Sequence, residues 1–353
     1  MKSVQVCQLS NSFEHVSVQE VPEPEPGPGE VKVRMLCCPV NPSDLNYIRG
    51  DYRDALGRMV WNLNREVPTF DPEGLMAYPE LPYALGGEGV GVVEKCGSGW
   101  LAKRLQGRRV AVAGGPPKGT WQEYVVVDAK KALPVPEGLS DQQAAMFIVN
   151  PLSAYAMVTR VLKVKKGSWL LQSAAGSALG KIVTRLGETL GFQTINIVRS
   201  EQGASQLRQL GTEHVVVSDG SDLSHQVASI TGGLGVQYAM DAVGGPLAEA
   251  MLRSLDLGGH MVLYGTLDDQ PMTLPSRDLM MPVTRVSGFF ALNWLANQHP
   301  LQILYLLRQI SRLQVSGLFN TPIAQSFPLN EVLTALETAT AKGRQGKVLL
   351  NIG

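Results

Sequence analysis

The sequence has little of what would assign it to a specialised class. Its 353 residues carry no formal net charge, and only 18% of them are charged. That balance does not favour nucleic acid or a charged membrane surface as a partner. No apolar run reaches the ~18 residues that a membrane-spanning helix needs. The first twenty residues alternate like a strand and match neither a signal peptide nor a transit peptide, so we expect a cytoplasmic protein.

Cysteine is also scarce. The four residues are Cys7, Cys37, Cys38 and Cys96. Their spacing matches neither a disulfide framework nor a zinc site, so we expect reduced and mostly buried thiols. Low-complexity segments and internal repeats are absent as well.

What the chain does have is a β-rich first part. Its length suggests two or three domains with an ample core. Up to residue 140, short β-prone runs are separated by proline and glycine, most densely at 22–29. The runs are 4–7, 16–18, 30–37, 89–95, 109–112 and 121–127. This spacing predicts a compact, barrel-like domain over residues 1–140.

From residue 141 to 285, helix-like and strand-like segments alternate. Such alternation predicts a doubly wound α/β domain, with a parallel sheet covered by helices on both faces. The segments are 144–162, 168–172, 181–190, 194–198, 204–210, 214–217, 236–241, 248–255 and 260–264. Two helices (300–314 and 328–342) and a strand (347–352) follow. This tail is too short for its own domain, so we expect it to complete the barrel and to place a ligand cleft between the domains.

The most informative stretch is 169–190. An apolar strand is followed by a turn of small residues and then by an amphipathic helix, which is the first half of a nucleotide-binding βαβ unit. Small residues let the backbone approach a pyrophosphate, and the helix N-terminus offers free N–H groups to it. The fingerprint is imperfect, because Ala174 and Leu179 stand at the first and third glycine positions and Gly180 comes one residue late. A turn that serves packing alone is the alternative.

The next strand, 194–198, ends at Arg199 and Ser200. An NAD site usually has an acidic residue here to bind the ribose hydroxyls, whereas arginine suits a 2′-phosphate. The sequence therefore favours NADPH, with a solvated arginine as the alternative. In addition, Ser140 with Gln143 fits a helix N-cap, and the strand that ends at Tyr264 would bring its end to the carboxyl edge of the sheet.

Several motifs along the whole chain resemble one family, the zinc-independent medium-chain dehydrogenases/reductases. The matching motifs are Asn-Pro-Ser-Asp (41–44), Gly-Gly-Glu-Gly (86–89), Gly-Arg-Arg-Val (107–110), the run 174–180, Asp-Ala-Val-Gly-Gly (241–245) and Gly-Lys-Val-Leu (346–349). The resemblance implies a GroES-like β-barrel catalytic domain, 1–140 completed by 286–353, and a Rossmann NADPH-binding domain, 141–285.

Within that family the chain is most similar to the 2-enoyl thioester reductases, and next to the quinone oxidoreductases. The narrower match lies in 41–52, 149–155 and 287–294. It implies NADPH-dependent reduction of a trans-2-enoyl group carried by coenzyme A or an acyl carrier protein. It also implies a homodimer and a place in fatty acid metabolism.

We predict no metal site. In the zinc-dependent members a histidine stands in a Gly-His-Glu segment, and Gly87 replaces it here. Only Cys96 lies where a four-cysteine zinc lobe would be, so neither a catalytic nor a structural ligand set exists. Alcohol oxidation would lose its Lewis acid, but reduction of an already polarised C=C bond needs none.

The reaction implied is a conjugate reduction, with hydride to Cβ, a proton to Cα and transient enolate charge on the thioester oxygen. Tyr52 matches the family's catalytic tyrosine. A phenol of pKa about 10 stays protonated at neutral pH and can donate its proton. The alternative is an ordinary turn tyrosine beside Gly50 and Asp51.

The resemblance also places the coenzyme. Asn150 is implied both at the catalytic centre and at the nicotinamide ribose, and Lys347 closes the site. The full set of implied contacts is Asn46, Asn150, Gly176, Ser177, Ala178, Leu179, Arg199, Ser200, Tyr264, Gly265, Thr266, Leu267, Phe289, Phe290, Ala291, Leu292 and Lys347. The alternatives are a turn role for Asn150, core packing for Phe289 and Phe290, and a solvated Lys347.

Two departures from the family pattern bear on specificity. Glu201 stands where a second basic residue is usual, which would weaken a preference for NADPH. The connection 53–80 is longer than usual and rich in apolar residues, so it is either a lid or a decorated loop. Two other functions stay open, namely an NADPH:quinone oxidoreductase and a non-catalytic NADPH-binding or redox-sensing protein.

Overall fold

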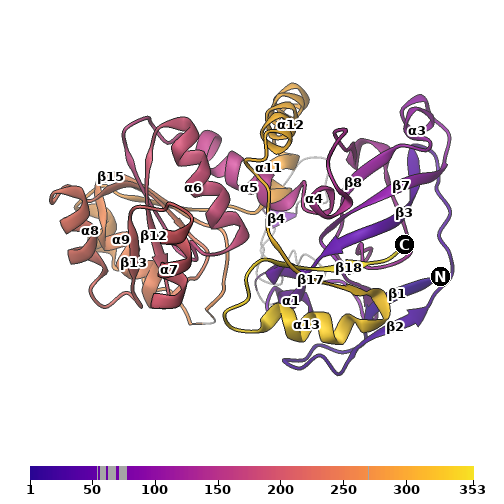
Figure 1. The fold of residues 1–353 in the computed structure, drawn as a ribbon, viewed down its shortest axis with the longest axis horizontal. Coiled ribbons are helices and arrows are strands. Elements are labelled where there is room, and N and C mark those ends of the chain that lie inside the picture. Colours follow the sequence, from indigo (N-terminus) through magenta and orange to yellow (C-terminus); the bar gives the residue numbers. More distant parts are fainter. Residues whose placement is uncertain (54, 56–60, 63–68, 71–77, 269) are drawn as a thin grey trace. The chain divides into compact units, whose positions relative to one another are not determined.

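The computed structural model describes residues 1–53, 55, 61–62, 69–70, 78–268 and 270–353 (Figure 1). Most of the long connection that we predicted to be a lid or a decorated loop lies outside these residues. The chain forms two compact units. Unit 1 comprises Met1–Val149 and Thr321–Gly353, and unit 2 comprises Asn150–Asn320.

Unit 1 is built from short strands, most of them antiparallel. The largest sheet has the order β10-β8-β7-β3-β18-β17, with β9 also paired to β3, and a smaller sheet has the order β2-β1-β6. The strands are β1 (Lys2–Val6), β2 (Val16–Glu20), β3 (Glu30–Pro39), β4 (Trp61–Asn62), β5 (Thr69–Phe70), β6 (Tyr83–Ala84), β7 (Glu88–Cys96), β8 (Arg109–Ala113), β9 (Tyr124–Asp128), β10 (Ala132–Pro134), β17 (Ile323–Pro328) and β18 (Lys347–Asn351). Its helices are α1 (Pro42–Arg49), α3 (Trp100–Leu105), α4 (Asp141–Ala145) and α13 (Val332–Thr340), with 3-10 turns at Ala129–Lys131 and Leu329–Glu331.

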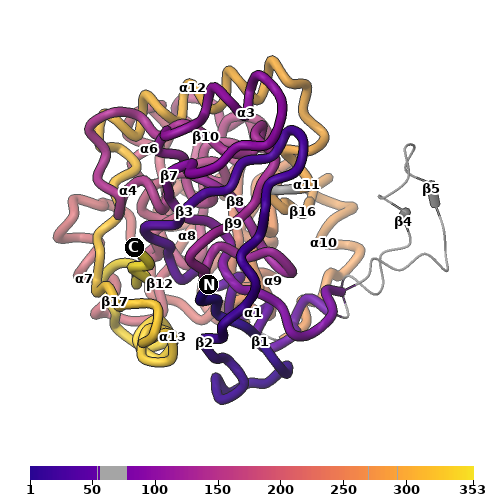
Figure 2. Tube along the Cα trace, turned by 90° about the vertical axis from the view of Figure 1, so that its right-hand side faces the viewer, coloured from indigo at the N-terminus to yellow at the C-terminus, as the bar shows by residue number. Residues whose placement is uncertain are grey.

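The C-terminal strand is part of this barrel-like unit. β18 pairs antiparallel with β3, with Leu350 opposite Cys38, and parallel with β17. Figure 2 shows the yellow helix α13 beside the indigo strand β2, and the two elements are in contact. The residues that close the chain therefore complete the core begun by its first forty residues, as the sequence predicts for 321–353.

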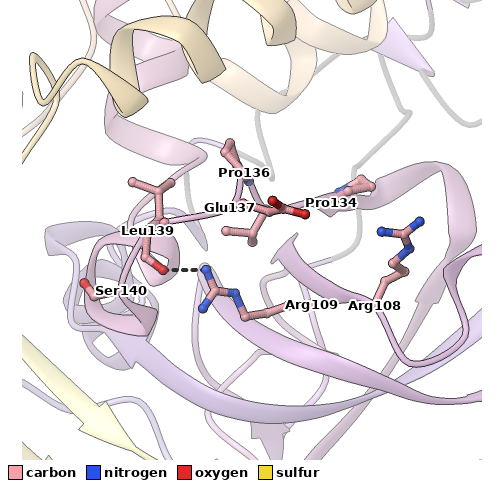
Figure 3. A pocket seen from close by; sticks show the side chains of 9 residues that line it. Arg108, Arg109, Pro134, Pro136, Glu137, Leu139 and Ser140 are labelled. Carbon is pink, nitrogen blue, oxygen red and sulfur yellow. Dashed lines mark hydrogen bonds between the residues drawn. The ribbon is translucent and has the colours of Figure 1, made fainter.

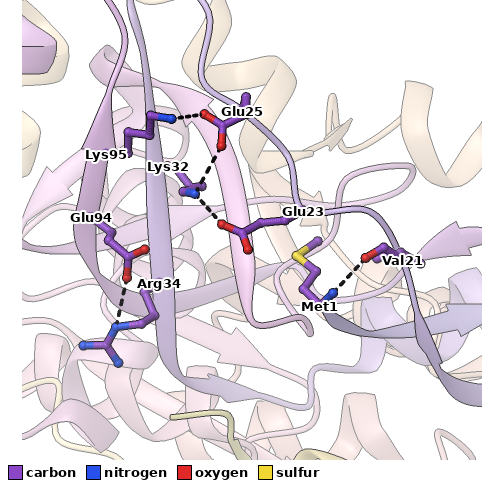
Figure 4. A network of polar contacts seen from close by, with 8 residues as sticks. All are labelled: Met1, Val21, Glu23, Glu25, Lys32, Arg34, Glu94 and Lys95. Carbon is purple, nitrogen blue, oxygen red and sulfur yellow. Dashed lines mark hydrogen bonds and ion pairs between the residues drawn. The ribbon is translucent and has the colours of Figure 1, made fainter.

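The proline-rich segment 22–28 is held along β3 and β7 by charged side chains (Figure 4). Lys32, which is only 4% exposed, binds Glu23 at 2.5 Å and lies 3.6 Å from Glu25. Lys95 forms an ion pair with the same Glu25. The buried ammonium of Lys32 also lies 5.1 Å from the centre of the Tyr124 ring. Prolines cannot donate to a sheet ladder, so side-chain contacts hold this segment instead.

Unit 2 contains one six-stranded parallel sheet in the order β13-β12-β11-β14-β15-β16. The strands are β11 (Trp169–Gln172), β12 (Gln193–Val198), β13 (Val215–Val217), β14 (Val236–Asp241), β15 (Leu255–Leu263) and β16 (Arg285–Gly288). The helices are α5 (Val149–Ala156, whose first residue belongs to unit 1), α6 (Ala178–Leu190), α7 (Glu201–Gln209), α8 (Leu223–Thr231), α9 (Gly245–Arg253), α10 (Ser276–Met280), α11 (Ala291–Ala296) and α12 (Pro300–Val315), with a π-helical turn at Met157–Val161 after α5.

This is the strand order of a doubly wound dinucleotide-binding sheet. The chain adds β12 and β13 on one side of its first strand, β11, and then adds β14, β15 and β16 on the other side. The predicted fold class is confirmed. Helix α6 shows why the pattern works, since Ile182, Val183 and Leu186 are buried while its outer residues stay polar. Helix α6 contacts β12, α7 contacts β12 and β13, and α9 contacts β14 and β15.

The boundaries of the units differ from those expected at residues 140 and 285. Residues 286–320 belong to unit 2, although we predicted that they complete the barrel. The reason is that β16 continues the parallel sheet, with Val286 opposite Met261, and Phe289 donates its N–H to the carbonyl of Leu263. At the C-terminal end of unit 2, the Arg185 guanidinium on α6 donates to the carbonyls of Leu318 and Asn320, which ties this end to the unit.

The four cysteines are free thiols. Cys37 and Cys38 are buried in β3, which raises their pKa values, to about 12 for Cys37. Cys96 is half-buried, but Cys7 is exposed, because it follows the last paired residue of β1. The expectation of mostly buried thiols therefore holds for β3 and fails at Cys7.

Candidate active site and coenzyme site

The small-residue turn between β11 and α6 has the geometry of a phosphate-binding turn. Ser177 caps α6, because its hydroxyl accepts the N–H of Gly180 at 3.0 Å. A Cβ on Gly180 would lie 2.6 Å from the carbonyl oxygen of Ala175, so only glycine lets the helix pack this closely on the turn. By contrast, a Cβ on Gly176 would meet nothing within 4 Å, so space is open beside Gly176. Ala178 and Leu179 follow as the first two residues of the helix, where N–H groups have no helical partner.

Ala174 occupies the first glycine position in a left-handed conformation, with φ of +48°. That conformation explains why glycine is usual there, since a Cβ strains the backbone. Residues 174–180 therefore form the phosphate-binding type of turn, although two of the three usual glycines are replaced.

A buried amide network fixes this turn to the sheet. Gln172 ends β11, and the two N–H groups of its Nε2 are shared among Gly180 O at 3.0 Å, Thr184 Oγ1 at 3.1 Å and Asn196 Oδ1 at 2.7 Å. These bonds join β11, α6 and β12 at one place. The position of the helix N-terminus is thus set by side chains as well as by backbone packing.

Arg199 follows the last residue of β12 and is exposed. Ser200 caps α7, its hydroxyl accepting the N–H of Gly203 at 3.2 Å. The Glu201 carboxylate lies 3.3 Å from the Arg208 guanidinium further along the same helix. Glu201 is therefore engaged by a cation of its own, and the guanidinium of Arg199 remains suited to an anion at the carboxyl edge of the sheet.

The predicted coenzyme residues 264–267 and 289–292 of unit 2 lie after the next strands at the same edge. Tyr264, Gly265, Thr266 and Leu267 follow β15. Gly265 is required by close packing, because a Cβ there would be 2.7 Å from the carbonyl oxygen of Ala242. Phe289 and Phe290 follow β16, and Ala291 and Leu292 begin α11. Phe289 is buried against Trp294, with ring centres 5.9 Å apart, whereas Phe290 is 51% exposed.

Asp241 organises the end of β14 next to these loops. Its carboxylate accepts the Ser173 hydroxyl at 2.6 Å and the N–H groups of Val243 at 3.1 Å and Gly244 at 2.7 Å. Burial raises its pKa, and these three hydrogen bonds act in the opposite direction. The Tyr264 hydroxyl is buried and has no hydrogen-bond partner among the described residues. Burial and the charge of Asp241 raise the pKa of that phenol, so it stays protonated.

The predicted residues of unit 1 lie on and beside α1. Asn41 begins this helix, and its backbone N–H is accepted by the Asp44 carboxylate at 2.8 Å in a capping box. Asn46 is buried on the helix, which ends at Gly50 in a left-handed conformation. Gly50 turns the chain so that Tyr52 follows within one short turn. Asn46 therefore lies just before this turn and Tyr52 just after it.

Tyr52 is half-buried, and its phenol is hydrogen-bonded to Asn46. Burial raises its pKa, while the hydrogen bond with Asn46 lowers it. Because burial is the larger effect, the phenol stays protonated at neutral pH and keeps its proton available to a reacting group. Asn150 lies near the start of α5 and is half-buried.

Lys347 lies in a buried cluster of charges inside unit 1. Its ammonium donates to the side-chain oxygen of Asn41 and, at 3.3 Å, to the carbonyl of Val40. The Glu88 carboxylate accepts the Asn41 amide at 3.1 Å. It also accepts the N–H groups of Ile148 at 3.2 Å and Val149 at 2.8 Å, at the start of α5. The lysine is 6% exposed, so it is not the solvated strand residue of the alternative interpretation.

This cluster shifts all three ionisable groups. Burial raises the pKa of Asp44 to about 7 and raises that of Glu88, although the charge of Lys347 pulls both down. Burial lowers the pKa of Lys347 to about 8, against the attraction of the two carboxylates. In the sequence, Asp44 and Glu88 stand out only as parts of family motifs. Their role as partners of Lys347 had no local signal, because 306 positions separate Lys347 from Asn41.

An open hollow of about 600 Å³ on unit 1 does not coincide with any predicted site residue. Figure 3 shows it beside the segment that leads from β10 to α4, where the Arg109 guanidinium donates to the carbonyl of Leu139. Arg109 also binds Asp141 at 3.0 Å. As predicted, Ser140 caps α4 through the N–H of Gln143. The Gln143 side chain does not close a capping box, however, because it bonds to the backbone of Thr321.

No three His, Cys, Asp or Glu side chains are grouped as a metal site would need within the described ranges of the chain. At Gly87, a Cβ would lie 3.5 Å from the Asp44 carboxylate. In the same described ranges, no helix is both long and apolar enough to cross a membrane.

A dinucleotide-type parallel sheet in one unit and a barrel-like unit that carries the half-buried phenol of Tyr52 are what an oxidoreductase of the expected class requires. Comparison with known proteins agrees with this class. Residues 27–137 match the alcohol dehydrogenase GroES-like domain, and residues 178–306 match the zinc-binding dehydrogenase model. The mitochondrial enoyl-[acyl-carrier-protein] reductase of Xenopus tropicalis is 30% identical over 315 residues, which covers 87% of this chain and 83% of the relative. The human enzyme of the same name is 28% identical and is covered to 81%.

Solved structures agree with the fold over the whole chain. A Bacillus thuringiensis protein, provisionally assigned as an NADPH:quinone reductase, is 28% identical with a TM-score of 0.86 and is covered to 99%. Escherichia coli quinone oxidoreductase, solved with NADPH, has a TM-score of 0.85 but only 23% identity, so it supports the fold alone. The chain belongs to the medium-chain dehydrogenase/reductase family, as its motifs predict.

Proposed function

We propose that this oxidoreductase uses NADPH to reduce the C=C bond of a 2-enoyl thioester. The observation that carries the proposal is the half-buried Tyr52 phenol, held by Asn46 at the end of α1 and kept protonated by burial. The resemblance in 41–52 and the 30% identity to an enoyl-[acyl-carrier-protein] reductase support the same substrate class.

The coenzyme residues fit NADPH. The open turn at Gly176 with the N-terminus of α6 suits a pyrophosphate, and Arg199 suits a 2′-phosphate. Because Glu201 is paired with Arg208, it does not offset the charge of Arg199 as its position in the sequence suggested. When bound, NADPH supplies the hydride that reaches Cβ of the substrate.

The chain's own residues then perform the other half of the reaction. Tyr52 gives its proton to Cα, and Asn46 holds the phenol in place through their hydrogen bond. A hydrogen-bond donor beside the thioester oxygen stabilises the enolate charge that develops there. We assign that donor to the α1–Tyr52 segment of unit 1.

The test is Tyr52→Phe, assayed with crotonyl-CoA by the loss of NADPH absorbance. We expect kcat to fall by about 10²- to 10⁴-fold, which is the usual contribution of a positioned acid. Unchanged turnover would refute the role of Tyr52. Enoyl thioesters of graded length, carried by coenzyme A or by acyl carrier protein, would then define the substrate and test a place in fatty acid metabolism.

A second function, NADPH:quinone reduction, is favoured by the full-length similarity to the B. thuringiensis protein. It requires no proton donor at Tyr52. Benzoquinones assayed beside crotonyl-CoA distinguish the two functions, since turnover that survives Tyr52→Phe with quinones alone would favour the second one. If NADPH binds and neither acceptor oxidises it, the protein is a non-catalytic binder.

The proposal includes a homodimer. β16 is the outer strand of the unit 2 sheet, and the residues leading into it are apolar and exposed, with Met280, Met281 and Val283 between 63% and 76% exposed. An open strand edge beside apolar side chains is suited to pairing with a second copy. Light scattering should give twice the chain mass, and Met281→Glu should give monomers. A cytoplasmic location is proposed from the sequence, and cell fractionation tests it.

A further inference from the structure

Four tyrosines of unit 1, one of which is the proposed proton donor Tyr52, form one cluster. The rings of Tyr47 and Tyr52 meet edge to face, with centres 5.1 Å apart and planes at 75°. Tyr78 lies 6.2 Å from Tyr47, and Tyr83 lies 6.3 Å from Tyr78. Tyr83 is only 1% exposed. The proposed mechanism uses Tyr52 and leaves the other three unexplained.

Two of these tyrosines, Tyr78 and Tyr83, are hydrogen-bonded to a single backbone carbonyl. The Tyr83 hydroxyl donates to the carbonyl of Tyr47 at 2.6 Å. The Tyr78 hydroxyl lies 3.3 Å from that carbonyl and 3.3 Å from the Tyr83 hydroxyl. Burial raises the pKa values of both phenols, so they remain donors.

This carbonyl belongs to the last turn of α1, where helical carbonyls lack helical partners. Its neighbours are bonded to backbone, since Asn46 O accepts the N–H groups of Gly50 and Asp51 and Ile48 O accepts that of Ser10. The Tyr47 carbonyl is bonded to phenols instead. Side chains from outside the helix thus fix the turn that leads into Tyr52.

We infer that Tyr78 and Tyr83 are positioning residues for Tyr52, which they hold through the carbonyl and the ring of Tyr47. This rests on the proposed function, in which Tyr52 donates the proton. The hydroxyls fix the end of α1, and the Tyr47 ring then limits the orientation of the Tyr52 ring. An edge-to-face pair has a preferred geometry that an aliphatic contact lacks.

The main experiment removes single hydroxyls. Tyr83→Phe and Tyr78→Phe keep the rings and lose the bonds to the Tyr47 carbonyl. We expect kcat with crotonyl-CoA to fall about tenfold in Tyr83→Phe, while KM for NADPH stays within about twofold, because misplacing a reacting group lowers kcat. The solvent deuterium isotope effect on kcat should rise, since proton donation becomes slower. A role in stability alone would reduce the amount of active enzyme and leave this isotope effect unchanged.

The ring contact is tested separately. Tyr47→Leu should lower kcat, and Tyr47→Phe should restore most of it, because it keeps the ring. Tyr124→Phe is the matched control, since it removes a phenol of β9 outside the cluster. It should match the wild type in kcat and in isotope effect.

The outcomes separate the two proposals. If Tyr52→Phe keeps full turnover, the proposed function fails and the positioning role fails with it. If Tyr52→Phe is impaired while Tyr78→Phe and Tyr83→Phe keep the wild-type kcat and isotope effect, the positioning role alone is overturned. Should Tyr83→Phe fail to fold, Tyr78→Phe decides the matter, because Tyr78 is only half-buried.

Discussion

The two units assemble their candidate sites in different ways. In unit 2, every predicted coenzyme residue after β11, β12, β15 and β16 reaches the same edge because the strands are parallel. In unit 1, the helix that carries Asn46 is fixed by groups distant in sequence, namely Lys347 and the tyrosines of the cluster. In unit 2, the parallel strands alone bring the residues that follow them to one edge of the sheet. In unit 1, the site depends on contacts between segments that are distant in sequence.

The largest expected effect on stability concerns the tertiary contacts of Lys347 in unit 1. Lys347→Met removes the cation that faces Asp44 and Glu88 while leaving both carboxyls buried. Loss of the hydrogen bonds that this buried ammonium makes with Asn41 and Val40, and of its attraction to the two carboxyls, should cost about 3 kcal/mol of unfolding free energy. Urea denaturation at pH 8 measures it. Lys342→Met removes an exposed lysine from the same region and should change stability by less than about 0.5 kcal/mol.

The loss in Lys347→Met should depend on pH. Burial raises the pKa of Asp44 to about 7 and raises that of Glu88. Carboxyls with raised folded pKa values favour folding at low pH, and this contribution is lost as pH rises through those values. Without the lysine both values rise further, so the deficit should be greatest at pH 8 and smaller at pH 5. Equal deficits in Lys347→Met and Lys342→Met would contradict the cluster.

Next in size is a matched pair in the phosphate-binding turn of unit 2. Gly180→Ala places a Cβ 2.6 Å from the Ala175 carbonyl oxygen and should cost about 2 kcal/mol of unfolding free energy. Gly176→Ala meets no atom within 4 Å, so it should leave stability nearly unchanged and weaken NADPH binding instead. Thermal unfolding and NADPH fluorescence titration measure the two effects. If Gly176→Ala binds NADPH like the wild type, the turn does not hold the pyrophosphate.

Coenzyme choice gives a smaller effect. Arg199→Ala should lower kcat/KM for NADPH by about tenfold through loss of a charge-assisted hydrogen bond, and should leave kcat/KM for NADH unchanged. Glu201→Gln is the control, and we expect little change in the ratio because Glu201 is already paired with Arg208. Near-equal use of both coenzymes by the wild type would remove the specificity assigned to Arg199.

The smallest effect concerns Ala174. Its φ of +48° is unfavourable for a residue with a Cβ. Ala174→Gly should raise the free energy of unfolding, by less than about 1 kcal/mol because glycine also gains freedom in the unfolded chain. A decrease in melting temperature would contradict the assigned strain.

The same contrast explains what the sequence could predict. Periodicity and the small-residue turn were enough to predict the doubly wound sheet, and the resemblance implied the coenzyme residues along its edge. Pairing of Lys347 with Asn41 and of Tyr83 with Tyr47 could not be predicted, because nothing local signals a contact between distant segments. The unit boundary near 285 was misplaced for a similar reason. The sheet to which a short strand such as β16 belongs is determined by its pairing with β15, which the sequence of β16 does not reveal.

The most direct test of the account follows both hydrogens into the product. Crotonyl-CoA is reduced once with deuterated NADPH in water and once with ordinary NADPH in deuterium oxide, and butyryl-CoA is analysed by mass spectrometry and NMR. We expect coenzyme deuterium at C3 and solvent deuterium at C2, with the C2 step slowed in Tyr52→Phe. Absence of coenzyme deuterium from C3, or no reduction of the thioester at all, would contradict it.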